Sequence, residues 1–582
     1  MTILVKRRVE NTDLDLPESI HPLLRRIYRQ RNIKNVSELQ LGLEHLIPPQ
    51  ELKGIDTAVD LLFDALEQQK KVLIVADFDA DGATSCTLAL KALKSFGFNN
   101  VDYIVPNRFD YGYGLTPEIV ELAKTKQPDL IVTVDNGISS IDGVKAAKAA
   151  NIKTLITDHH LPGREQPDAD AIVNPNQHGC NFPSKSIAGV GVIFYVMLAL
   201  RAKLREVGWF SAQKIAEPNM GELLDLVALG TVADVVALDR NNRILVHEGL
   251  KRIRSGRTRP GINSLLQIAK RNPASLVASD LGFSVGPRLN AAGRLDDMST
   301  GIECLLAERE GTAYKYALQL DSMNKSRKQI EGDMQEQALK YLQEFTLEQT
   351  ELPAALSLYD PRWHQGVVGI LASRVKEKFN RPVIAFAKAN IDSPDSSELK
   401  GSGRSIKGFH IRDALDAIAT KNPGLINKFG GHAMAAGLSL EENDLEAFTQ
   451  AFQEHAASLL DDDLLQAKIL SDGELESADF SMSIATELAD AGPWGQEFPE
   501  PAFNGTFNVI QHRRVGENHL KLMLSPINAR QQTMDAIAFN VSSNQWPGEH
   551  IKQIEIVYRM DINEFRGVRS LQLMVEHILG WQ

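Results

Sequence analysis

The stretch that decides the fold is VLIVADFDADGATS, residues 72–85. Its first five residues are all apolar, which predicts a short strand buried on both faces. Three aspartates follow at alternating positions, Asp77, Asp79 and Asp81, and a helical pattern begins near Thr84. A buried strand that leads through a polar turn into a helix is the opening unit of a parallel α/β sheet.

The same alternation continues along the first half of the chain. Short apolar runs predict further strands at 103–105, 130–134 and 154–157. Helical patterns lie at 117–126, 140–150, 187–200 and 223–236. Unbroken apolar strands separated by helices are typical of a parallel sheet covered on both faces. We therefore predict a doubly wound α/β domain.

The second half of the chain divides into three kinds of pattern. Residues 312–345 contain no proline and one glycine, which predicts a single helix about 50 Å long. Mixed strands and helices follow, and five alternating runs near the C-terminus predict a small OB-type β-barrel. The expected parts are an N-terminal helical segment with the α/β domain (1–309), a connecting helix (310–347), a second α/β domain (348–462) and the barrel (463–582).

Composition excludes several classes of protein. The 582 residues are 43% hydrophobic and 24% charged, with a net charge of −12, so the chain is not disordered. The longest apolar run, 187–200, is shorter than the ~20 residues that span a bilayer, and no signal-peptide core is evident. Three distant cysteines exclude a disulfide framework and a thiolate zinc site. We expect a cytoplasmic protein with no membrane partner.

Carboxylates and imidazoles follow the predicted strands where each strand ends. They are Asp77, Asp79 and Asp81 after the first strand, Asp135 after 130–134, and Asp158, His159 and His160 after 154–157. A single aspartate after a strand is commonly a helix N-cap, so the whole set carries the argument. Because the carboxyl ends of parallel strands share one edge, these side chains should converge.

Converging carboxylates repel one another unless cations lie among them. Oxygen ligands with one or two imidazoles and no thiolate favour Mg²⁺ or Mn²⁺ over structural zinc. A pair of such ions lowers the pKa of water and stabilises charge on a phosphoryl oxygen. The residues therefore predict a centre for two divalent cations and hydrolysis of a phosphate ester.

Several motifs, in their order along the chain, resemble the DHH phosphoesterase superfamily. They are DFDADG (77–82), PNRFDYGYGL (106–115), VDNG (134–137) and DHH (158–160). WHQGVVGILASRV (363–375), GSGRS (401–405) and FGGHAMAAG (429–437) resemble its companion DHHA1 domain. VGPRLNAAGR (285–294) and the C-terminal stretch at 558–575 are similar to the branch of 5′→3′ exonucleases specific for single-stranded DNA. The resemblance extends from about residue 40 to the end.

The resemblance implies a set of site residues. The metal ligands would be Asp77, Asp79, Asp81, Asp135, His159 and Asp234, with Asp135 bridging two ions. Asp234 lies in LVALGTVADVVAL (226–238), where Asp225 is a nearby competitor. Asp158 and His160 would be catalytic, with His160 facing the scissile phosphate or, alternatively, supporting the metal ligands.

Six further residues would bind the strand: Arg108, Tyr113, Arg288, Ser402, Arg404 and His432. Guanidinium forks and a hydroxyl suit phosphate, and in the related exonucleases these motifs hold the 5′ end. The alternatives are surface ion pairs for the arginines and a capping role for His432. Basic clusters at 240–259 and in the barrel, where aromatic residues are interleaved, also suit a single strand.

The function that the resemblance implies is a single-stranded-DNA-specific 5′→3′ exonuclease in DNA repair and recombination. It would use Mn²⁺ or Mg²⁺, release 5′-mononucleotides and act as a monomer. Single-strand-binding protein and a RecQ-type helicase are the implied partners. Two alternatives stay open: a DHH phosphodiesterase for nanoRNA or cyclic dinucleotides, and an inactive scaffold that binds replication proteins.

Overall fold

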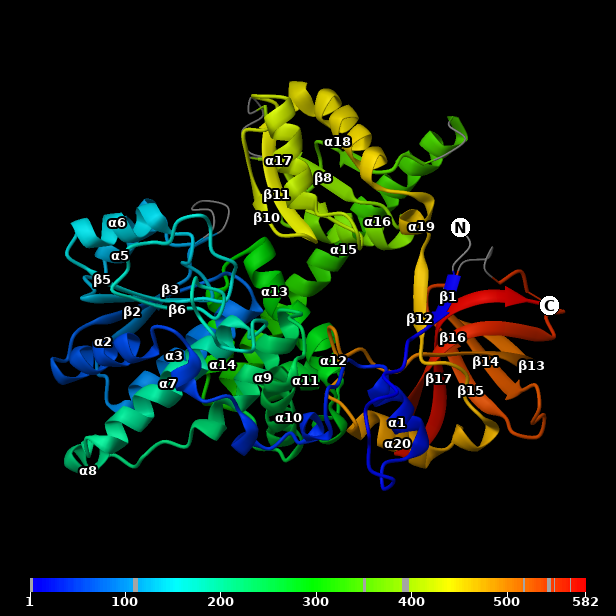
Figure 1. The fold of residues 1–582 in the computed structure, drawn as a ribbon, viewed down its shortest axis with the longest axis horizontal. Helices are drawn as coiled ribbons and strands as arrows, with labels where there is room; N and C mark the ends of the chain where they lie inside the picture. The colour runs from blue at the N-terminus through cyan, green and yellow to red at the C-terminus, as the bar shows by residue number, and fades with distance from the viewer. Residues whose placement is uncertain are drawn as a thin grey trace. The chain divides into compact units, whose positions relative to one another are not determined.

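The computed structural model describes residues 4–107, 114–348, 352–389, 397–516, 519–541, 546–548, 550–565 and 567–582 (Figure 1). They form two compact units. The first comprises Arg7–Met323 together with Ser471–Gln582, and the second comprises Asn324–Leu470 with the N-terminal residues up to Lys6. Within the ranges just given, no helix has both the length and the apolar character to cross a membrane.

A parallel five-stranded sheet organises the first unit, in the order β3-β2-β4-β5-β6. Its strands are β2 (Val72–Ala76), β3 (Val101–Ile104), β4 (Leu130–Val134), β5 (Lys153–Thr157) and β6 (Ala171–Val173). The doubly wound fold is confirmed, and the four predicted strands are present with ends moved by at most two residues. β6 was not predicted because three residues are too few to show a pattern.

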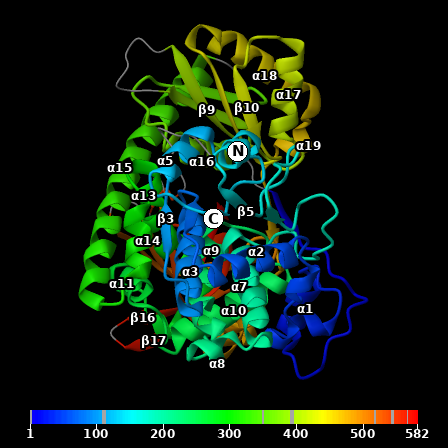
Figure 2. The same cartoon turned by 90° about the vertical axis from the view of Figure 1, so that its left-hand side faces the viewer.

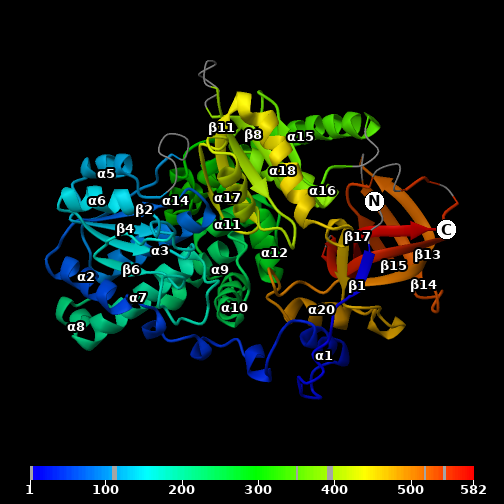
Figure 3. The same ribbon diagram turned by 45° about the horizontal axis from the view of Figure 1, so that its top comes forward.

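The sheet is covered on both faces, which explains its unbroken apolar strands. Alternate residues of β2 enter different cores: Val72 and Ile74 pack in one, and Leu73 and Val75 in the other. Figures 1 and 3 show α5 and α6 on one face and α2, α3 and α7 on the other. These helices are α2 (Ile55–Glu67), α3 (Ala80–Phe96), α5 (Pro117–Lys124), α6 (Ile141–Ala149) and α7 (Gly189–Glu206).

Further helices complete the first unit. α9 (Leu224–Ala233) packs against α3 and α7, and a one-turn π-helix (Leu281–Val285) lies against α9. The other members are α1 (Pro22–Arg29), α8 (Trp209–Gln213), α10 (Arg240–Arg254), α11 (Pro260–Ile268), α12 (Ala278–Asp280), α13 (Gly286–Leu295) and α14 (Ser299–Leu306). The predicted long helix is α15 (Glu310–Glu348), seen lengthwise in Figure 2.

The second unit contains a mixed sheet in the order β10-β11-β9-β8-β7, in which only the β7–β8 pair is parallel. Its strands are β7 (Leu356–Tyr359), β8 (Val383–Lys388), β9 (Glu398–Arg404), β10 (Lys428–Gly431) and β11 (Ala435–Glu441). Its helices are α16 (Val368–Phe379), α17 (Ile411–Lys421), α18 (Leu445–Leu459) and α19 (Asp462–Leu465). A two-stranded sheet joins β1 (Leu4–Arg7) to β12 (Lys468–Ser471).

The C-terminal residues form the predicted closed barrel, in the order β13-β14-β15-β17-β16. Its strands are β13 (Phe503–Val515), β14 (His519–Pro526), β15 (Met534–Ala538), β16 (Gln553–Phe565) and β17 (Val568–Trp581), and α20 (Met482–Asp490) packs beside them. Leu23 and Ile27 of α1 belong to the barrel's core cluster. The barrel thus shares a compact unit with the parallel sheet, and the four-part division by sequence stays a prediction.

Candidate metal centre

The structure brings all six predicted metal ligands together at the carboxyl edge of the parallel sheet. Three overlapping groups each hold ligand atoms within 4.8 Å of one another. The groups are Asp135 with His159 and His160, Asp81 with His159 and Asp234, and Asp77 with Asp79 and Asp135. Asp77 and Asp135 directly follow β2 and β4, and His159 is the second residue after β5, as the strand pattern predicts. β2 lies between β3 and β4, so the centre forms where the strand order reverses.

His159 lies between two carboxylates that come from different elements. Its Nε2 is 3.1 Å from Asp135 Oδ1 and 3.4 Å from Asp234 Oδ2. Asp234 ends α9, which delivers it to the sheet edge. The competitor Asp225 is engaged elsewhere, because its carboxylate forms an ion pair of 2.6 Å with Arg259 and accepts a hydrogen bond from Thr258. The geometry therefore favours Asp234 over Asp225 as the metal ligand.

Burial and mutual repulsion make this centre a place for cations. Burial and the charge of Asp79 raise the pKa of Asp81 to about 7. Burial and the neighbouring carboxylates also raise the pKa values of Asp135 and Asp234 well above the ordinary range. A divalent cation removes this repulsion, and carboxylate oxygens with an imidazole are a ligand set that suits Mg²⁺ or Mn²⁺. The residues present therefore fit two such ions.

Two of the aspartates also accept hydrogen bonds from backbone N–H groups at the start of a helix. Asp79 is the N-cap of α3, and its Oδ1 accepts hydrogen bonds from the backbone N–H groups of Asp81 and Gly82. The Asp81 carboxylate accepts from the N–H groups of Gly189 and Val190, at 2.6 and 2.9 Å, where α7 begins. Free N–H groups at a helix start stabilise an anion. Each of the two carboxylates keeps lone pairs that these N–H groups do not use, and they are available to a cation.

Asp135 occupies a strained and crowded position. Its backbone is left-handed, with φ 63°, which is uncommon for a residue other than glycine. A Cβ at Gly189 would lie 2.6 Å from Asp135 Oδ1, so only glycine leaves room for this carboxylate. Asn136 supports the turn by donating hydrogen bonds to the carbonyls of Val75 and Val134. Sequence reasoning missed Asn136, although an amide directly after a buried strand was a signal.

Asp158 has the geometry of a positioning residue. It accepts hydrogen bonds from the backbone N–H groups of Ile138, His159 and His160. Its Oδ1 also lies 2.7 Å from His160 Nδ1. Burial acts against its ionisation, but the hydrogen bond and charge of His160 lower the pKa of Asp158 to about 2. In turn, Asp158 outweighs the effect of burial and raises the pKa of His160 to about 9.

The VGPRLNAAGR motif supports the aspartate loop from the other side. Asn290 of α13 accepts a hydrogen bond of 2.7 Å from the N–H of Ala80. A Cβ at Gly293 would lie 1.7 Å from the carbonyl oxygen of Phe78, so this close approach requires glycine. Sequence reasoning selected this motif for phosphate binding and missed Asn290 and Gly293. These two residues of the motif hold the DFDADG turn in place.

Arg288 of the same motif is paired within the protein. Its Nε and Nη2 lie 2.9 and 2.8 Å from Asp321 Oδ1, and its Nη1 donates to the carbonyl of Ser284. Its side chain is 14% exposed. A phosphate-binding role for Arg288 stays a prediction, and it requires a strand to reach or displace this pair. Arg108 and Tyr113 lie outside the described residues.

Ser402, Arg404 and His432 belong to the second unit, where three predicted motifs meet. Arg404 Nη1 donates to Ser402 Oγ at 3.1 Å on β9. A Cβ at Gly369, in the first turn of α16, would lie 2.9 Å from Ser402 Oγ and 3.0 Å from Arg404 Nη2. β9 pairs with β11, and His432 is exposed in the turn that leads to β11. A guanidinium, a hydroxyl and a helix start therefore lie together.

The two basic clusters differ in what they offer to a strand. In the 240–259 stretch, Arg243 is buried against Glu38 and the ring of Phe498, and Arg259 is paired with Asp225. These two arginines are engaged within the fold, whereas Lys251 and Arg257 of the same stretch are exposed, and strand binding by this stretch stays a prediction. In the barrel, Arg513 and Arg569 are exposed.

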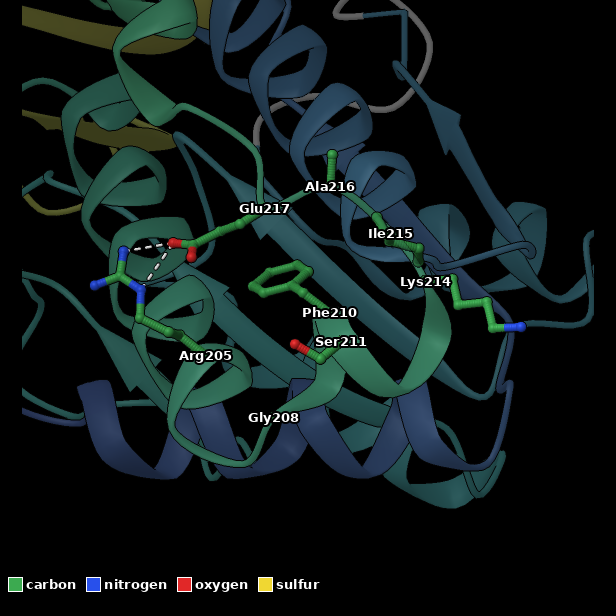
Figure 4. Close-up of a pocket in the computed structure, with 8 residues that line it drawn as sticks. All are labelled: Arg205, Gly208, Phe210, Ser211, Lys214, Ile215, Ala216 and Glu217. Carbon is green, nitrogen blue, oxygen red and sulfur yellow. Dashed lines mark hydrogen bonds and ion pairs between the residues drawn. The ribbon is translucent and has the colours of Figure 1, made fainter.

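A separate pocket lies where α7 leads into α8 (Figure 4). It is lined by Arg205, Gly208, Phe210, Ser211, Lys214, Ile215, Ala216 and Glu217. Arg205 Nε donates to Glu217 at 2.8 Å, so two of the three charged side chains of the lining are paired with each other. No predicted site residue lines this pocket, which makes it a poor candidate for the reaction.

Comparisons with known proteins agree with the domain motifs. Residues 71–231 match the DHH family N-terminal domain, 352–458 match the DHHA1 domain and 471–577 match the RecJ OB domain. The single-stranded-DNA-specific exonuclease RecJ of Salmonella typhimurium is 54% identical over 574 residues, which are 99% of this chain and 98% of that protein.

Two solved structures of RecJ from Thermus thermophilus share the fold. The structure in complex with Mn²⁺ superposes with a TM-score of 0.76 at 27% identity, covering 96% of this chain and 76% of that one. The structure in complex with Mg²⁺ gives a TM-score of 0.71 at 25% identity, covering 96% and 75%. The near-complete match to the Salmonella protein, together with the three domain matches, shows that this chain belongs to the RecJ family of the DHH superfamily.

Proposed function

We propose that this chain is an exonuclease specific for single-stranded DNA, which degrades strands from the 5′ end and releases 5′-mononucleotides. The convergence of six carboxylate and imidazole ligands at one sheet edge is the observation that carries the proposal. The family supports the substrate, because its curated members are named single-stranded-DNA-specific exonucleases. DNA repair and recombination are the processes that need such an activity.

The proposed roles follow from the contacts in the centre. Asp77, Asp79, Asp81, Asp135, His159 and Asp234 would hold two Mn²⁺ or Mg²⁺ ions. When bound, such a pair supplies an activated water and neutralises charge on the phosphodiester. His160, raised in pKa and held through Nδ1 by Asp158, would present its other ring edge to the scissile phosphate. A cationic imidazole there stabilises negative charge that develops on the phosphate.

The second unit would bind the phosphate backbone. Arg404, Ser402 and the start of α16 offer charge-assisted and neutral donors to one anion. His432 adds an exposed imidazole in the turn before β11, the strand that pairs with β9. Exposed arginines of the barrel would extend the contact along the strand. Arg108 and Tyr113 complete the proposed set on the strength of the resemblance.

The finer biological setting is proposed on the same basis. We expect a monomer in the cytoplasm that is recruited by single-strand-binding protein and a RecQ-type helicase. The three cysteines are free and buried, as a reducing compartment permits.

The decisive experiment is a nuclease assay with end-labelled substrates. Purified protein with Mn²⁺ or Mg²⁺ should convert 5′-labelled single strands directly to labelled mononucleotides and should shorten 3′-labelled strands progressively. Duplexes, RNA dinucleotides and cyclic dinucleotides should remain intact. Preferential hydrolysis of dinucleotides would instead identify a small-substrate phosphodiesterase, and inactivity on every substrate would indicate a binding scaffold.

A pair of variants tests the origin of the 5′ polarity. Arg288→Ala removes the guanidinium, whereas Asp321→Asn keeps it and removes its charged partner. If Arg288 binds a terminal phosphate, Arg288→Ala should lower kcat/KM about tenfold more for 5′-phosphorylated than for 5′-hydroxyl strands, because the terminal phosphate carries the extra charge. Asp321→Asn should keep that preference. Equal losses on both strands in both variants would show that the pair only supports the fold.

A further inference from the structure

Three strongly exposed apolar side chains belong to segments that carry metal ligands or pack against one that does. Phe283 is 84% exposed, Val235 is 65% exposed and Leu161 is 57% exposed, which places them among the five most exposed large apolar residues of the described part of the chain. Leu161 directly follows His160, and Val235 directly follows Asp234. Such exposure is unfavourable in water, and its concentration around a functional centre points to a binding surface.

The turn that carries Phe283 is fastened to the end of α9. A Cβ at Gly282 would lie 3.2 Å from Val232 Cγ1, and a Cβ at Gly286 would lie 3.0 Å from Ala233 Cβ. These two α9 residues immediately precede Asp234. The π-helical turn is therefore packed against the segment that delivers a metal ligand, and short π-helical turns occur frequently at functional sites.

The remaining side chains of the turn point inward. Leu281 and Val285 are fully buried, and Ser284 is buried with its Oγ accepting a hydrogen bond from Arg271. Its carbonyl accepts from Arg288. With both flanks anchored, Phe283 is held in place on an ordered backbone while its ring stays in water. Val235 adds strain at the same rim, since a β-branched residue rarely adopts its φ of 61°.

We propose that Phe283, together with Val235, forms a stacking platform for a nucleobase next to the scissile phosphate. The inference rests on the proposed function, because a strand whose phosphate lies at the metal centre must place the adjoining base within reach of the rim. A phenyl ring has a π-face and no hydrogen-bonding group, so it supports any base equally. This suits an enzyme that degrades strands irrespective of sequence. Phe283 is thus a positioning residue that holds the nucleotide while the centre acts on its phosphate.

Abasic substrates test the platform directly. In a 5′-phosphorylated oligothymidine series with one abasic nucleotide at successive positions, the parent enzyme should lose about tenfold in kcat/KM at one position near the 5′ end. Phe283→Ala should lose about tenfold on the intact strand and show no further loss at that position. Phe283→Trp should restore the parent pattern, and Phe283→Leu, which is apolar but cannot stack, should resemble Phe283→Ala. Tyr314→Ala, at a 39% exposed aromatic residue of α15, is the matched control and should behave like the parent.

Fluorescence gives a readout that does not depend on turnover. In EDTA, the indole of Phe283→Trp should be quenched by oligothymidine beyond any change in the parent protein, and an abasic strand should quench it less. A strand that binds without extra quenching, or a Phe283→Leu enzyme with the parent's abasic pattern, would overturn the platform and leave the proposed function standing. If the parent neither binds nor cleaves single strands, the proposed function itself is wrong, and so is the stacking role of Phe283 that rests on it.

Discussion

Asp135 illustrates how a single residue is prepared for a cation. It is 1% exposed, its backbone is left-handed, and its carboxylate lies against Gly189 and 3.1 Å from His159. Burial and four neighbouring aspartates hold its pKa well above the ordinary range, so without cations the protonated form of this carboxyl is favoured. Cation binding therefore has to release that proton, so the affinity for the metal depends on the protonation of Asp135.

We predict that Asp135→Asn uncouples stability from metal binding. Asparagine has the shape of the protonated acid, so the metal-free variant should unfold at the same temperature as the parent or above it. The rise in Tm that saturating Mn²⁺ produces in the parent should disappear, and turnover should fall by at least about 100-fold, since several kcal/mol of charge stabilisation are lost.

Differential scanning fluorimetry in EDTA and in Mn²⁺ measures both effects, together with a nuclease assay. Asp142→Asn, at an exposed position of α6, is the control and should keep the Mn²⁺ response. An Asp135→Asn protein that retains the full Mn²⁺-dependent rise in Tm would remove Asp135 from the ligand set.

At the scale of elements, the centre depends on how helices meet the sheet edge. The start of α7 binds the Asp81 carboxylate, the end of α9 supplies Asp234, and α13 packs against the turn between β2 and α3 and forms a hydrogen bond with it. Each helix contributes through one terminus or one tight contact. The loop of aspartates is thereby held in one conformation before any cation binds, which lowers the entropic cost of binding.

We predict that Gly293→Ala damages the centre from a distance. The new methyl group would have to displace the carbonyl of Phe78, which lies between Asp77 and Asp79. We expect a loss of about 1–3 kcal/mol in the free energy of unfolding, together with weaker Mn²⁺ binding, because overpacking shifts the backbone. Urea denaturation and Mn²⁺ titration by calorimetry measure the two effects.

Gly311→Ala is the matched control for that experiment. Gly311 lies in the first turn of α15 with no atom within 4 Å of the position of a new Cβ, so the substitution should leave Mn²⁺ affinity unchanged. Parent-like Mn²⁺ affinity in Gly293→Ala would show that α13 supports the fold without shaping the centre.

At the scale of the whole molecule, the barrel is integrated with the N-terminal segment. Asp472, which precedes the barrel, forms a buried bidentate ion pair with Arg31 at 2.6 and 2.9 Å. Residues of α1 lie in the barrel core. Deleting residues 470–582 would leave a buried guanidinium without its partner, a defect that typically costs about 3–5 kcal/mol. A truncated protein could therefore lose strand binding simply because it is destabilised. Substitutions of exposed residues of the barrel test strand binding without this effect.

We predict that the double variant Arg513→Ala/Arg569→Ala weakens binding of long strands while leaving the cleavage of bound strands unchanged. Both side chains are exposed on the barrel, so the fold should be unaffected. If both contact phosphates, the slope of log affinity against log salt should become shallower by about 1.4.

Fluorescence anisotropy at several salt concentrations, with single-turnover cleavage on the same strands, measures the two properties. Lys94→Ala/Lys214→Ala, at two exposed lysines outside the barrel, removes the same charge and should leave the slope as it is in the parent. An equal change of the salt slope in the two double variants would show that the barrel arginines act only through the net charge of the protein.

The sequence alone determined the parallel sheet and the composition of the centre. Strands buried on both faces must be continuously apolar, so β2, β4 and β5 are visible as runs of about five residues. Their carboxyl ends share an edge, so the aspartates and histidines that follow them had to converge. The long helix and the five barrel strands could also be predicted from the spacing of apolar residues within each segment.

Only the tertiary structure decided which side chains are already engaged. It separates Asp234 from Asp225, pairs Arg288 with Asp321, buries Arg243, and shows that Asn290 and Gly293 serve the aspartate loop. It also exposes Phe283 on a turn that packs against the end of α9. A periodic pattern reports the environment of a segment because burial repeats along it. The partner of one charged or aromatic side chain depends on the packing of segments that are distant in the chain, and no local pattern records it.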